Sequence, residues 1–374
     1  MIHFFYQAFF FCALLFMFLH RLFSKKRRDL HLKDRLGFSF TPTTSDFTIW
    51  LHCVSVGETK AVKALYKKLK EAYPNAHFVI TNQTVTGHKI AQKELRSADQ
   101  YRFFPMDFGI VVKSVIKKVK PNLFITAETD IWPKFLQETK KQGCFNFVVN
   151  AKMSQKTYKR LKRMPFFARF LYKHMDLILA QSDTHKKRFL DLKIKCPIEV
   201  IGNLKCDPTN YELKNFNREM LGLNKDDFVI VVGSTHDPEE KLLLDIFKNL
   251  IKSIENIRIF LVPRHPERFN EVEEMLISLP YTRLSKGNFA EEKIILVDQM
   301  GKLDALYQIA DISIVAGSFT EKVGGHNILE PIFAKSALFF GPHMHGQQEL
   351  EELVLQANAG LKEPLNQLAE TLQE

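Results

Sequence analysis

The sequence of 374 residues has little cysteine and lacks the residue patterns of common metal sites. Its five cysteines are odd in number and form no C-x-x-C pair, which fits a reducing compartment better than a disulfide scaffold or a zinc site. Neither an H-E-x-x-H motif nor an Asp-x-Asp pair occurs, and there is no short-period repeat or low-complexity segment. We therefore expect a globular protein with no dedicated metal and no cofactor.

The composition is that of an ordinary globular chain with an excess of positive charge. Hydrophobic residues make up 45% and charged residues 25% of the chain, and at about 100–200 residues per domain the length predicts two domains. The net charge of +11 favours an anionic partner such as nucleic acid, acidic lipid or a phosphorylated substrate. Because the basic residues are spread over many predicted helices, nucleic acid is not singled out, and we expect none as a partner.

The first residues form a long apolar run. Residues 2–19 are apolar except at His3, Tyr6 and Gln7, and five basic residues follow between positions 21 and 28. As a helix this run would be about 27 Å long, just enough to span a bilayer core. The flanking charge predicts a membrane anchor over residues 1–23 that leaves the rest of the protein in the cytoplasm. A spanning helix, a helix lying in the interface and a buried core helix all remain open, with membrane attachment favoured.

Beyond residue 48, apolar runs alternate with amphipathic helical patterns. This alternation predicts an α/β protein with two doubly wound, Rossmann-like domains, because buried parallel strands read as continuous apolar segments. The expected strands are 48–54, 77–81, 122–126, 145–149, 176–180, 228–232, 258–262, 293–297, 312–315 and 337–340. Gly202, Pro208 and neighbouring polar residues break the pattern. We place one domain at 24–205 and the other at 206–374.

Polar motifs follow the predicted strands in both halves. In doubly wound sheets, ligands bind outside the carboxyl ends of the strands. The recurrence of polar motifs at these ends predicts one cleft between two facing domains. Glu58 follows the first strand and is either a first-turn carboxylate that complements a helix dipole or a general base. Arg264 and Ser234 are placed to meet a phosphate, or else are a surface arginine and a helix cap.

The densest motif is the glycine-rich stretch from Val315 to Pro331. Gly317, Gly324 and Gly325 would let the backbone approach a ligand, and a following helix would offer free N–H groups to an anion. Asn327 and Glu330 have the spacing of a capping box. Alternatively, Pro331 occupies the first helical position and leaves Glu330 as a cap residue whose carboxylate could bind a ribose diol. Both interpretations remain open from the sequence.

Taken together and in order, the motifs resemble one family, the 3-deoxy-D-manno-octulosonic acid (Kdo) transferases of lipopolysaccharide assembly. The matching segments are Val56–Ala61, Phe104–Asp107, Glu128–Pro133, Asn150–Ser154, Gly202–Asp207, Gly233–His236, Leu261–Phe269 and Gly324–Pro331. Each motif alone is modest, whereas the ordered set is specific.

The resemblance implies an inverting glycosyltransferase with the GT-B fold, which moves Kdo from CMP-Kdo onto a lipid A precursor at the cytoplasmic face of the inner membrane. The N-terminal domain would bind the acceptor lipid and the C-terminal domain the nucleotide sugar. Glu58 matches the family's base, and Asp107 a second cleft carboxylate, so we predict both as catalytic. The predicted substrate-binding residues are Lys205, Ser234, Arg264, His265, Gly317, Ser318, Gly325, Asn327 and Glu330.

Two other functions are compatible with parts of the sequence. One is a GT-B transferase that uses a UDP-sugar for another envelope glycan, which a preference for UDP over CMP would reveal. The other is a membrane-tethered protein that binds acidic lipid or nucleic acid without catalysis. That function would leave Glu58 and the loop around Glu330 unexplained.

Overall fold

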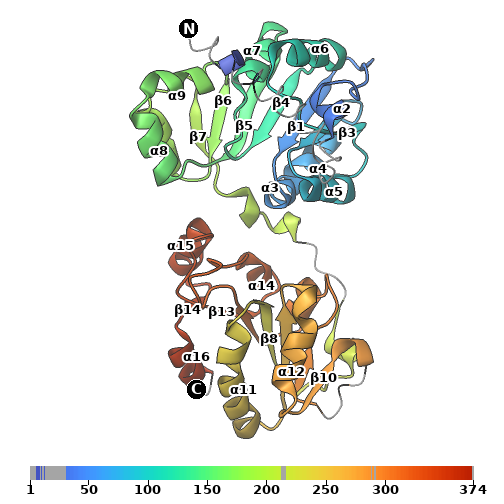
Figure 1. Cartoon of the computed structure of the whole chain (residues 1–374), viewed down its shortest axis with the longest axis vertical. Coiled ribbons are helices and arrows are strands. Elements are labelled where there is room, and N and C mark those ends of the chain that lie inside the picture. Colours follow the sequence, from blue (N-terminus) through green and yellow to red (C-terminus); the bar gives the residue numbers. More distant parts are fainter. Residues whose placement is uncertain are drawn as a thin grey trace. The chain divides into compact units, whose positions relative to one another are not determined.

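The computed structural model describes residues 6–8, 10, 12, 31–211, 216–287, 289 and 292–372. It divides into two compact units, Met1–Asn210 and Tyr211–Glu374, each a parallel sheet covered by helices (Figure 1). The two Rossmann-like α/β units predicted from the sequence are thus confirmed as folds. The prediction placed the join after Lys205. Asn210 shows why the first unit extends further: its side chain bonds to Ala64 N at 3.0 Å and to Leu204 O at 2.7 Å.

The first unit is built on a seven-stranded parallel sheet with the order β3-β2-β1-β4-β5-β6-β7. Its strands are β1 (Thr48–Cys53), β2 (His77–Asn82), β3 (Gln100–Phe103), β4 (Leu123–Ala127), β5 (Phe145–Ala151), β6 (Leu177–Ala180) and β7 (Ile198–Val200). Its helices are α2 (Leu32–Arg35), α3 (Val56–Ala61), α4 (Lys63–Ala72), α5 (Val85–Glu94), α6 (Gly109–Val119), α7 (Pro133–Lys141), α8 (Gln155–Lys162), α9 (Pro165–Tyr172) and α10 (Asp183–Asp191). Two short 3₁₀ turns, Leu204–Cys206 and Pro208–Asn210, close the unit.

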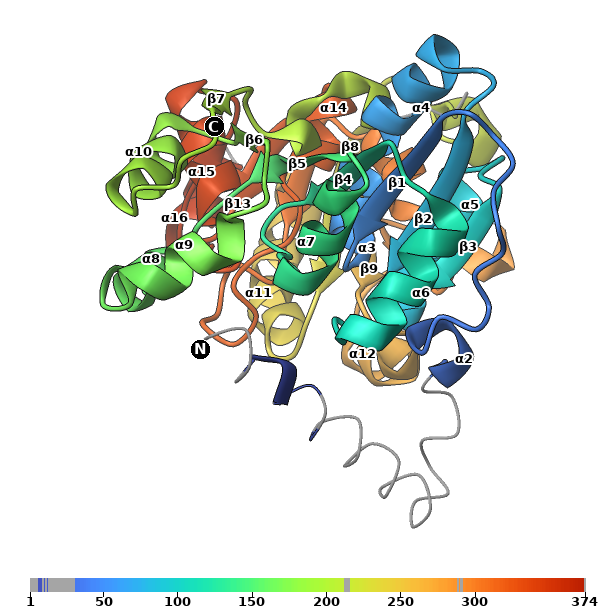
Figure 2. The same ribbon diagram turned by 90° about the horizontal axis from the view of Figure 1, so that it is seen from above.

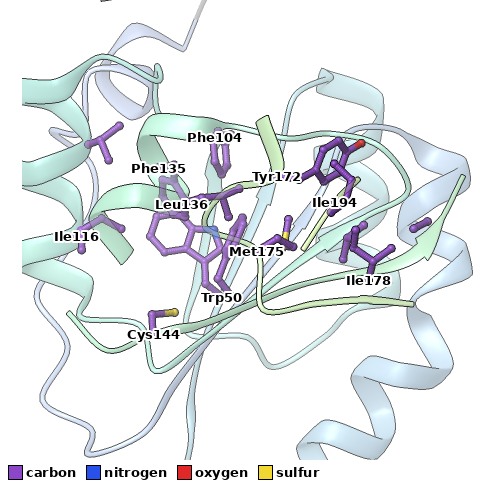
Figure 3. Packing of buried hydrophobic residues seen from close by; sticks show 14 of the residues in the cluster. Trp50, Phe104, Ile116, Phe135, Leu136, Cys144, Tyr172, Met175, Ile178 and Ile194 are labelled. Carbon is purple, nitrogen blue, oxygen red and sulfur yellow. The ribbon is translucent and has the colours of Figure 1, made fainter. Parts of the chain in front are cut away.

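Helices cover both faces of this sheet, which explains its continuously apolar strands. On one face, α6, α7, α9 and α10 contribute to a cluster that includes Trp50 and Phe135. Figure 2 shows α6, α7 and α9 along this face. Those two rings meet edge to face with their centroids 4.9 Å apart (Figure 3). On the other face, α4 and α5 pack on Ile49, Leu51 and Phe78. Both β1 surfaces are therefore buried, and the loop after β1 is held firmly at the edge of the sheet.

The second unit repeats the design with the strand order β10-β11-β9-β8-β12-β13-β14. Its strands are β8 (Phe228–Thr235), β9 (Ile257–Pro263), β10 (Tyr281–Arg283), β11 (Ile294–Leu296), β12 (Ile312–Val315), β13 (Ala337–Phe340) and β14 (Leu361–Lys362). Its helices are α11 (Glu239–Ser253), α12 (Phe269–Leu276), α13 (Leu303–Tyr307), α14 (Leu329–Phe333), α15 (Gln348–Gln356) and α16 (Leu365–Thr371), with 3₁₀ turns at Arg218–Leu221, Pro266–Arg268 and Leu284–Lys286. Helices α11, α12 and α16 share one apolar cluster with the sheet.

The predicted membrane anchor over residues 1–23 lies almost wholly outside the described residues. Within the part of the chain that the structure describes, no helix is both long and apolar enough to cross a membrane. Tyr6 and Gln7, which belong to the apolar run, contact the first unit at Asp107. The anchor therefore stays a prediction.

Candidate functional site

Each unit has one place where the strand order reverses. In the first unit, β1 lies between β2 and β4, and in the second unit, β8 lies between β9 and β12. At such a reversal the connections leave toward opposite faces, and the carboxyl ends of the two strands open a crevice for a ligand. Glu58 follows β1, and the Gly317 loop follows β12. The sequence motifs thus lie where this topology favours binding.

Glu58 lies in the first turn of α3 and is held by hydrogen bonds to the N-cap Ser55 and to Val54 before it. The Ser55 hydroxyl accepts a bond from Glu58 N, and the Glu58 carboxylate accepts one from Val54 N at 2.6 Å. Burial raises the pKa of Glu58 to about 7; the bond from Val54 N opposes the shift, and the negative charges of Glu128 and Asp130 add to it. A carboxyl group that titrates near neutral pH can take a proton from a substrate hydroxyl.

Beside Glu58 lies an ionic cluster that the sequence did not single out. Glu128, which follows β4, is 8% exposed and pairs with Lys152 at 2.7 Å and with Lys205 at 3.4 Å. Its backbone has φ 57°, a left-handed conformation that non-glycine residues seldom adopt outside special sites. Asn150, after β5, shares this conformation with φ 55° and bonds to Leu204 N at 2.9 Å. The predicted Lys205 is thereby held close to Glu128, the neighbour of Glu58.

Asp107 occupies a buried structural position. Its carboxylate accepts bonds from Lys134 N at 2.9 Å and Phe135 N at 2.6 Å, in the first turn of α7, and from the Tyr6 hydroxyl at 2.8 Å. Burial raises the pKa of Asp107 to about 6. These contacts account for the carboxylate as a helix cap, and they lend no support to the predicted catalytic role.

In the second unit, a buried carboxylate that the sequence analysis missed ties two loops together. Glu239 is 0% exposed and accepts bonds from Gly317 N at 2.7 Å, Phe319 N at 3.0 Å and His236 N at 3.1 Å. It thereby joins the loop after β8 to the loop after β12. Its position at the start of α11 resembles an ordinary first-turn acid in the sequence, so only the folded chain reveals its function.

The glycines of the β12 loop are required by close approach. Gly317 has φ 72° and Gly325 has φ 87°, and Gly325 N donates to Gly317 O at 2.7 Å. A Cβ on Gly325 would lie 2.3 Å from the Met344 sulfur, and one on Gly317 would lie 2.6 Å from the His326 ring. Ser318 is fully buried, and its hydroxyl donates to Val315 O and accepts from Gly341 N. Its side chain therefore bonds within the fold and holds the loop in place.

Helix α14 begins at Leu329, so Pro331 is its third residue and not its first. The interpretation of Glu330 as the cap residue before Pro331 is therefore wrong, and Asn327 is not the N-cap either, because Ile328 holds that position. Asn327 Oδ1 accepts from Leu329 N at 3.1 Å, and its amide donates to Glu330 at 3.1 Å. The two side chains nevertheless form one polar pair at the helix N-terminus.

Three polar groups that have no side-chain partner among the described residues lie at the ends of β8 and β9. The Ser234 hydroxyl and the exposed Arg264 guanidinium make no side-chain bond to the described residues, and buried Thr235 Oγ1 likewise lacks a partner among them. Arg264 N donates to Thr235 O at 3.1 Å, which places the two segments side by side. Ser234 has φ 60°, another left-handed residue at a strand end. Together these groups suit an oxyanion.

Imidazole rings flank this group of donors. His236 and His326 face each other with their Nε2 atoms 2.8 Å apart, and His265 meets the His236 ring edge to face. Burial lowers the pKa of His326 to about 4, with further lowering by His236 and Arg264. Among the described residues no cluster of three metal-binding side chains occurs.

The structure thus groups nine of the predicted residues into three sets and leaves the other two in structural positions. Glu58 and Lys205 gather around Glu128 in the first unit. Ser234, Arg264, His265, Gly317 and Gly325 gather around the imidazoles in the second. Asn327 and Glu330 form a pair on α14. Asp107 and Ser318 are engaged within the fold.

Family models and curated relatives show what this chain is similar to. The family model described as 3-deoxy-D-manno-octulosonic-acid transferase (kdotransferase) matches residues 30–208. A transferase of that name from Chlamydophila psittaci is 34% identical over 366 residues, covering 93% of this chain and 84% of the relative. One from Rickettsia bellii is 30% identical, covering 91% and 82%.

Solved structures at low identity share the fold alone. A UDP-N-acetylglucosamine 2-epimerase superimposes with TM-score 0.60 at 11% identity, covering 88% of this chain and 87% of the other. MurG from Acinetobacter baumannii superimposes with TM-score 0.53 at 12% identity, covering 88% and 91%. With the sequence relatives, these findings confirm the resemblance drawn from the motifs: the chain belongs to the 3-deoxy-D-manno-octulosonic acid transferase family of glycosyltransferases.

Proposed function

We propose that this protein transfers Kdo from CMP-Kdo to a hydroxyl of a lipid A precursor, with inversion at the transferred carbon and with Glu58 as the general base. Membership of the transferase family supports the transfer of Kdo. The raised pKa of Glu58, at the strand reversal of the first unit, is the observation that carries the choice of base.

In the proposed reaction, the acceptor oxygen forms a bond to the anomeric carbon of Kdo as the bond from that carbon to the CMP phosphate oxygen breaks. The acceptor proton passes to Glu58, and the bonding electron pair leaves with CMP. Kdo carries a carboxylate, and the ammonium groups held by Glu128 match that charge. Lys152 and Lys205 would therefore orient the sugar acid beside the base.

In the second unit, the hydroxyls of Ser234 and Thr235 and the guanidinium of Arg264 have no side-chain partner among the described residues, and they suit the phosphate of CMP. Preorganised donors can stabilise the charge that develops on a leaving phosphate. The Asn327–Glu330 pair, at 3.1 Å, would accept the hydroxyls of the ribose.

The substitution Glu58→Gln tests the proposed base. It keeps the length of the side chain and an oxygen that can accept from Val54 N, but it removes the carboxylate that would take the proton. Product would be measured by mass spectrometry with CMP-Kdo and a tetraacyl lipid A precursor, and CMP binding by calorimetry. We expect turnover to fall by on the order of 10²-fold or more with CMP affinity unchanged. The matched control is Glu71→Gln, on the exposed end of α4. Near-normal turnover of Glu58→Gln would remove Glu58 as the base.

The same binding experiment separates the nucleotides, because CMP should bind more tightly than UDP. A preference for UDP would favour a transferase for another envelope glycan. We also propose that residues 1–23 attach the protein to the cytoplasmic face of the inner membrane. Deleting them should release it into the soluble fraction, whereas retention in the membrane pellet at low and high salt would contradict the anchor.

A further inference from the structure

The β3 edge of the first sheet carries a cation that the proposed chemistry does not use. Arg35, the last residue of α2, donates from Nη1 to Gln83 Oε1 at 2.8 Å and from Nη2 to Gln83 O at 3.0 Å. Both partners are neutral. A guanidinium group has five N–H donors, and the side chain of Arg35 makes no ion pair and no other hydrogen bond with the residues that the structure describes. It is partly buried, with donors to spare.

The surroundings of Arg35 leave its charge poorly compensated. Burial lowers the pKa of Arg35, and Asp34 only partly opposes this. The Asp34 carboxylate already accepts from Phe103 N at 2.8 Å. A second guanidinium, that of Arg102, also ends on neutral oxygens, since it donates to Ser39 O at 2.8 Å and to its neighbour's carbonyl. Neither guanidinium contacts a carboxylate among the residues that the structure describes, so the two create a locally positive surface.

Aromatic stacking fixes the geometry of this surface. The Phe103 ring lies between two imidazoles, with His31 stacked at 3.8 Å and His88 at 4.6 Å between centroids. The Arg35 guanidinium lies 5.8 Å from the centroid of the same ring. Because Phe103 is buried, the cation is held by a rigid support and not by a mobile surface loop.

This cation is linked to the base through one short path. Gln83 follows β2, the neighbour of β1. The next residue, Thr84, donates to Val54 O from its backbone N at 3.2 Å and from its hydroxyl at 3.0 Å, and Val54 N donates to Glu58 at 2.6 Å. Arg35 and Glu58 are thus joined by hydrogen bonds through Gln83, Thr84 and Val54, at the carboxyl ends of two neighbouring strands.

We propose that Arg35 binds a phosphate monoester of the acceptor, carried on the same sugar as the hydroxyl that receives Kdo. The forked N–H groups of an arginine match two phosphate oxygens, and the remaining donors of Arg35 suit this arrangement. The proposal rests on the proposed function, which supplies an acceptor with a hydroxyl and a phosphate. It assigns the β3 edge to recognition of the acceptor and leaves the chemistry to Glu58.

The test compares two acceptors in two proteins: wild type and Arg35→Gln, each with the bisphosphorylated lipid A precursor and with the same lipid after removal of the phosphate next to the acceptor hydroxyl. We expect Arg35→Gln to raise KM for the phosphorylated acceptor by roughly 10- to 100-fold. On the dephosphorylated acceptor the variant and the wild type should be alike, because the group that Arg35 contacts is gone. The matched control is Arg96→Gln, at an exposed arginine beyond the C-terminal end of α5. It should leave KM unchanged for both acceptors.

Each other outcome overturns the assignment. An equal loss on both acceptors, or a loss of thermal stability that Arg35→Lys does not restore, would make Arg35 a structural residue. No change on either acceptor would remove it from recognition. Inorganic phosphate that binds wild type as tightly as the lipid does would indicate a free-ion site. Failure of wild type to form any Kdo product would refute the proposed function itself, a result that the wild-type reactions alone reveal.

Discussion

The two units share a topology but build their sites from different materials. In the first unit the strand reversal is lined by charged side chains, with Glu58 and Glu128 beside two lysines. In the second unit the reversal is lined by glycine backbone and by the side chains of Ser234, Thr235 and Arg264, which have no side-chain partner among the described residues. One buried carboxylate, that of Glu239, organises the loops there. Charged side chains that shift each other's pKa are suited to proton transfer, whereas fixed backbone N–H groups are suited to binding an anion. On the proposed function, the reversal in the first unit would serve acid–base chemistry and the reversal in the second would bind the nucleotide.

The strongest test of this difference between the two units is the substitution Glu239→Gln in the second unit. The amide cannot accept three bonds to backbone N–H groups as the carboxylate does, so the loops after β8 and β12 should separate. We expect CMP to bind roughly 10- to 100-fold more weakly, measured by calorimetry. Glu255→Gln, in the exposed turn after α11, is the control. Unchanged CMP affinity would show that the carboxylate does not organise the site.

A smaller effect should appear in the pH dependence of the first unit. In the proposed reaction Glu58 must be ionised to accept a proton, and burial raises the pKa of Glu58 to about 7. The rate should therefore rise with pH up to about 7 and fall roughly tenfold per unit well below it. Folding stability should move in the opposite direction. Because the folded pKa exceeds the unfolded value, the contribution of Glu58 is present below pH about 4.5 and is lost as pH rises through about 7.

Initial rates across pH 5–9 would measure the first effect, with CMP binding measured over the same range to show that the donor is not responsible. A rate that is flat between pH 5 and 7 would contradict the raised pKa of Glu58.

The mildest test concerns the glycine loop. Gly325→Ala places a Cβ 2.3 Å from the Met344 sulfur at φ 87°. Gly222→Ala shares the left-handed backbone, with φ 67°, but meets nothing within 4 Å. Both should lose stability, by about 1–2 kcal/mol from the backbone alone, measured by thermal unfolding. Only Gly325→Ala should also weaken CMP binding, by a few-fold. Equal CMP affinity in the two variants would show that close approach at Gly325 is not needed.

The interior strands of both sheets were predictable, and the four that were missed are the edges. β3, β7, β10 and β14 end the two sheets, and their sequences, such as QYRF and YTR, mix polar and apolar residues. An edge strand is short and half covered, so it lacks the continuous apolar run by which a buried strand is recognised.

The candidate site was predictable where a motif follows a strand directly, as at Glu58 and Arg264. The role of Glu128 depends on two lysines that lie 24 and 77 positions further along the chain and on a left-handed backbone. Glu239 acts on backbone groups 78 and 80 positions away. No local pattern encodes such pairings. For the same reason the sequence could not show that Asp107 and Ser318 are engaged within the fold.

Val54 is bonded on both sides, and this has a consequence for the order of events. Its N–H holds the Glu58 carboxylate and its carbonyl holds Thr84, the residue after the support of Arg35. On the proposed function, an acceptor bound at Arg35 would therefore act on the Glu58 carboxyl through the two backbone groups of a single residue, Val54. Water carries no phosphate and would not bind Arg35. On this proposal, CMP-Kdo would therefore be protected from hydrolysis until the lipid acceptor binds. A base whose titration is unmoved by bound acceptor would show that the two events are independent.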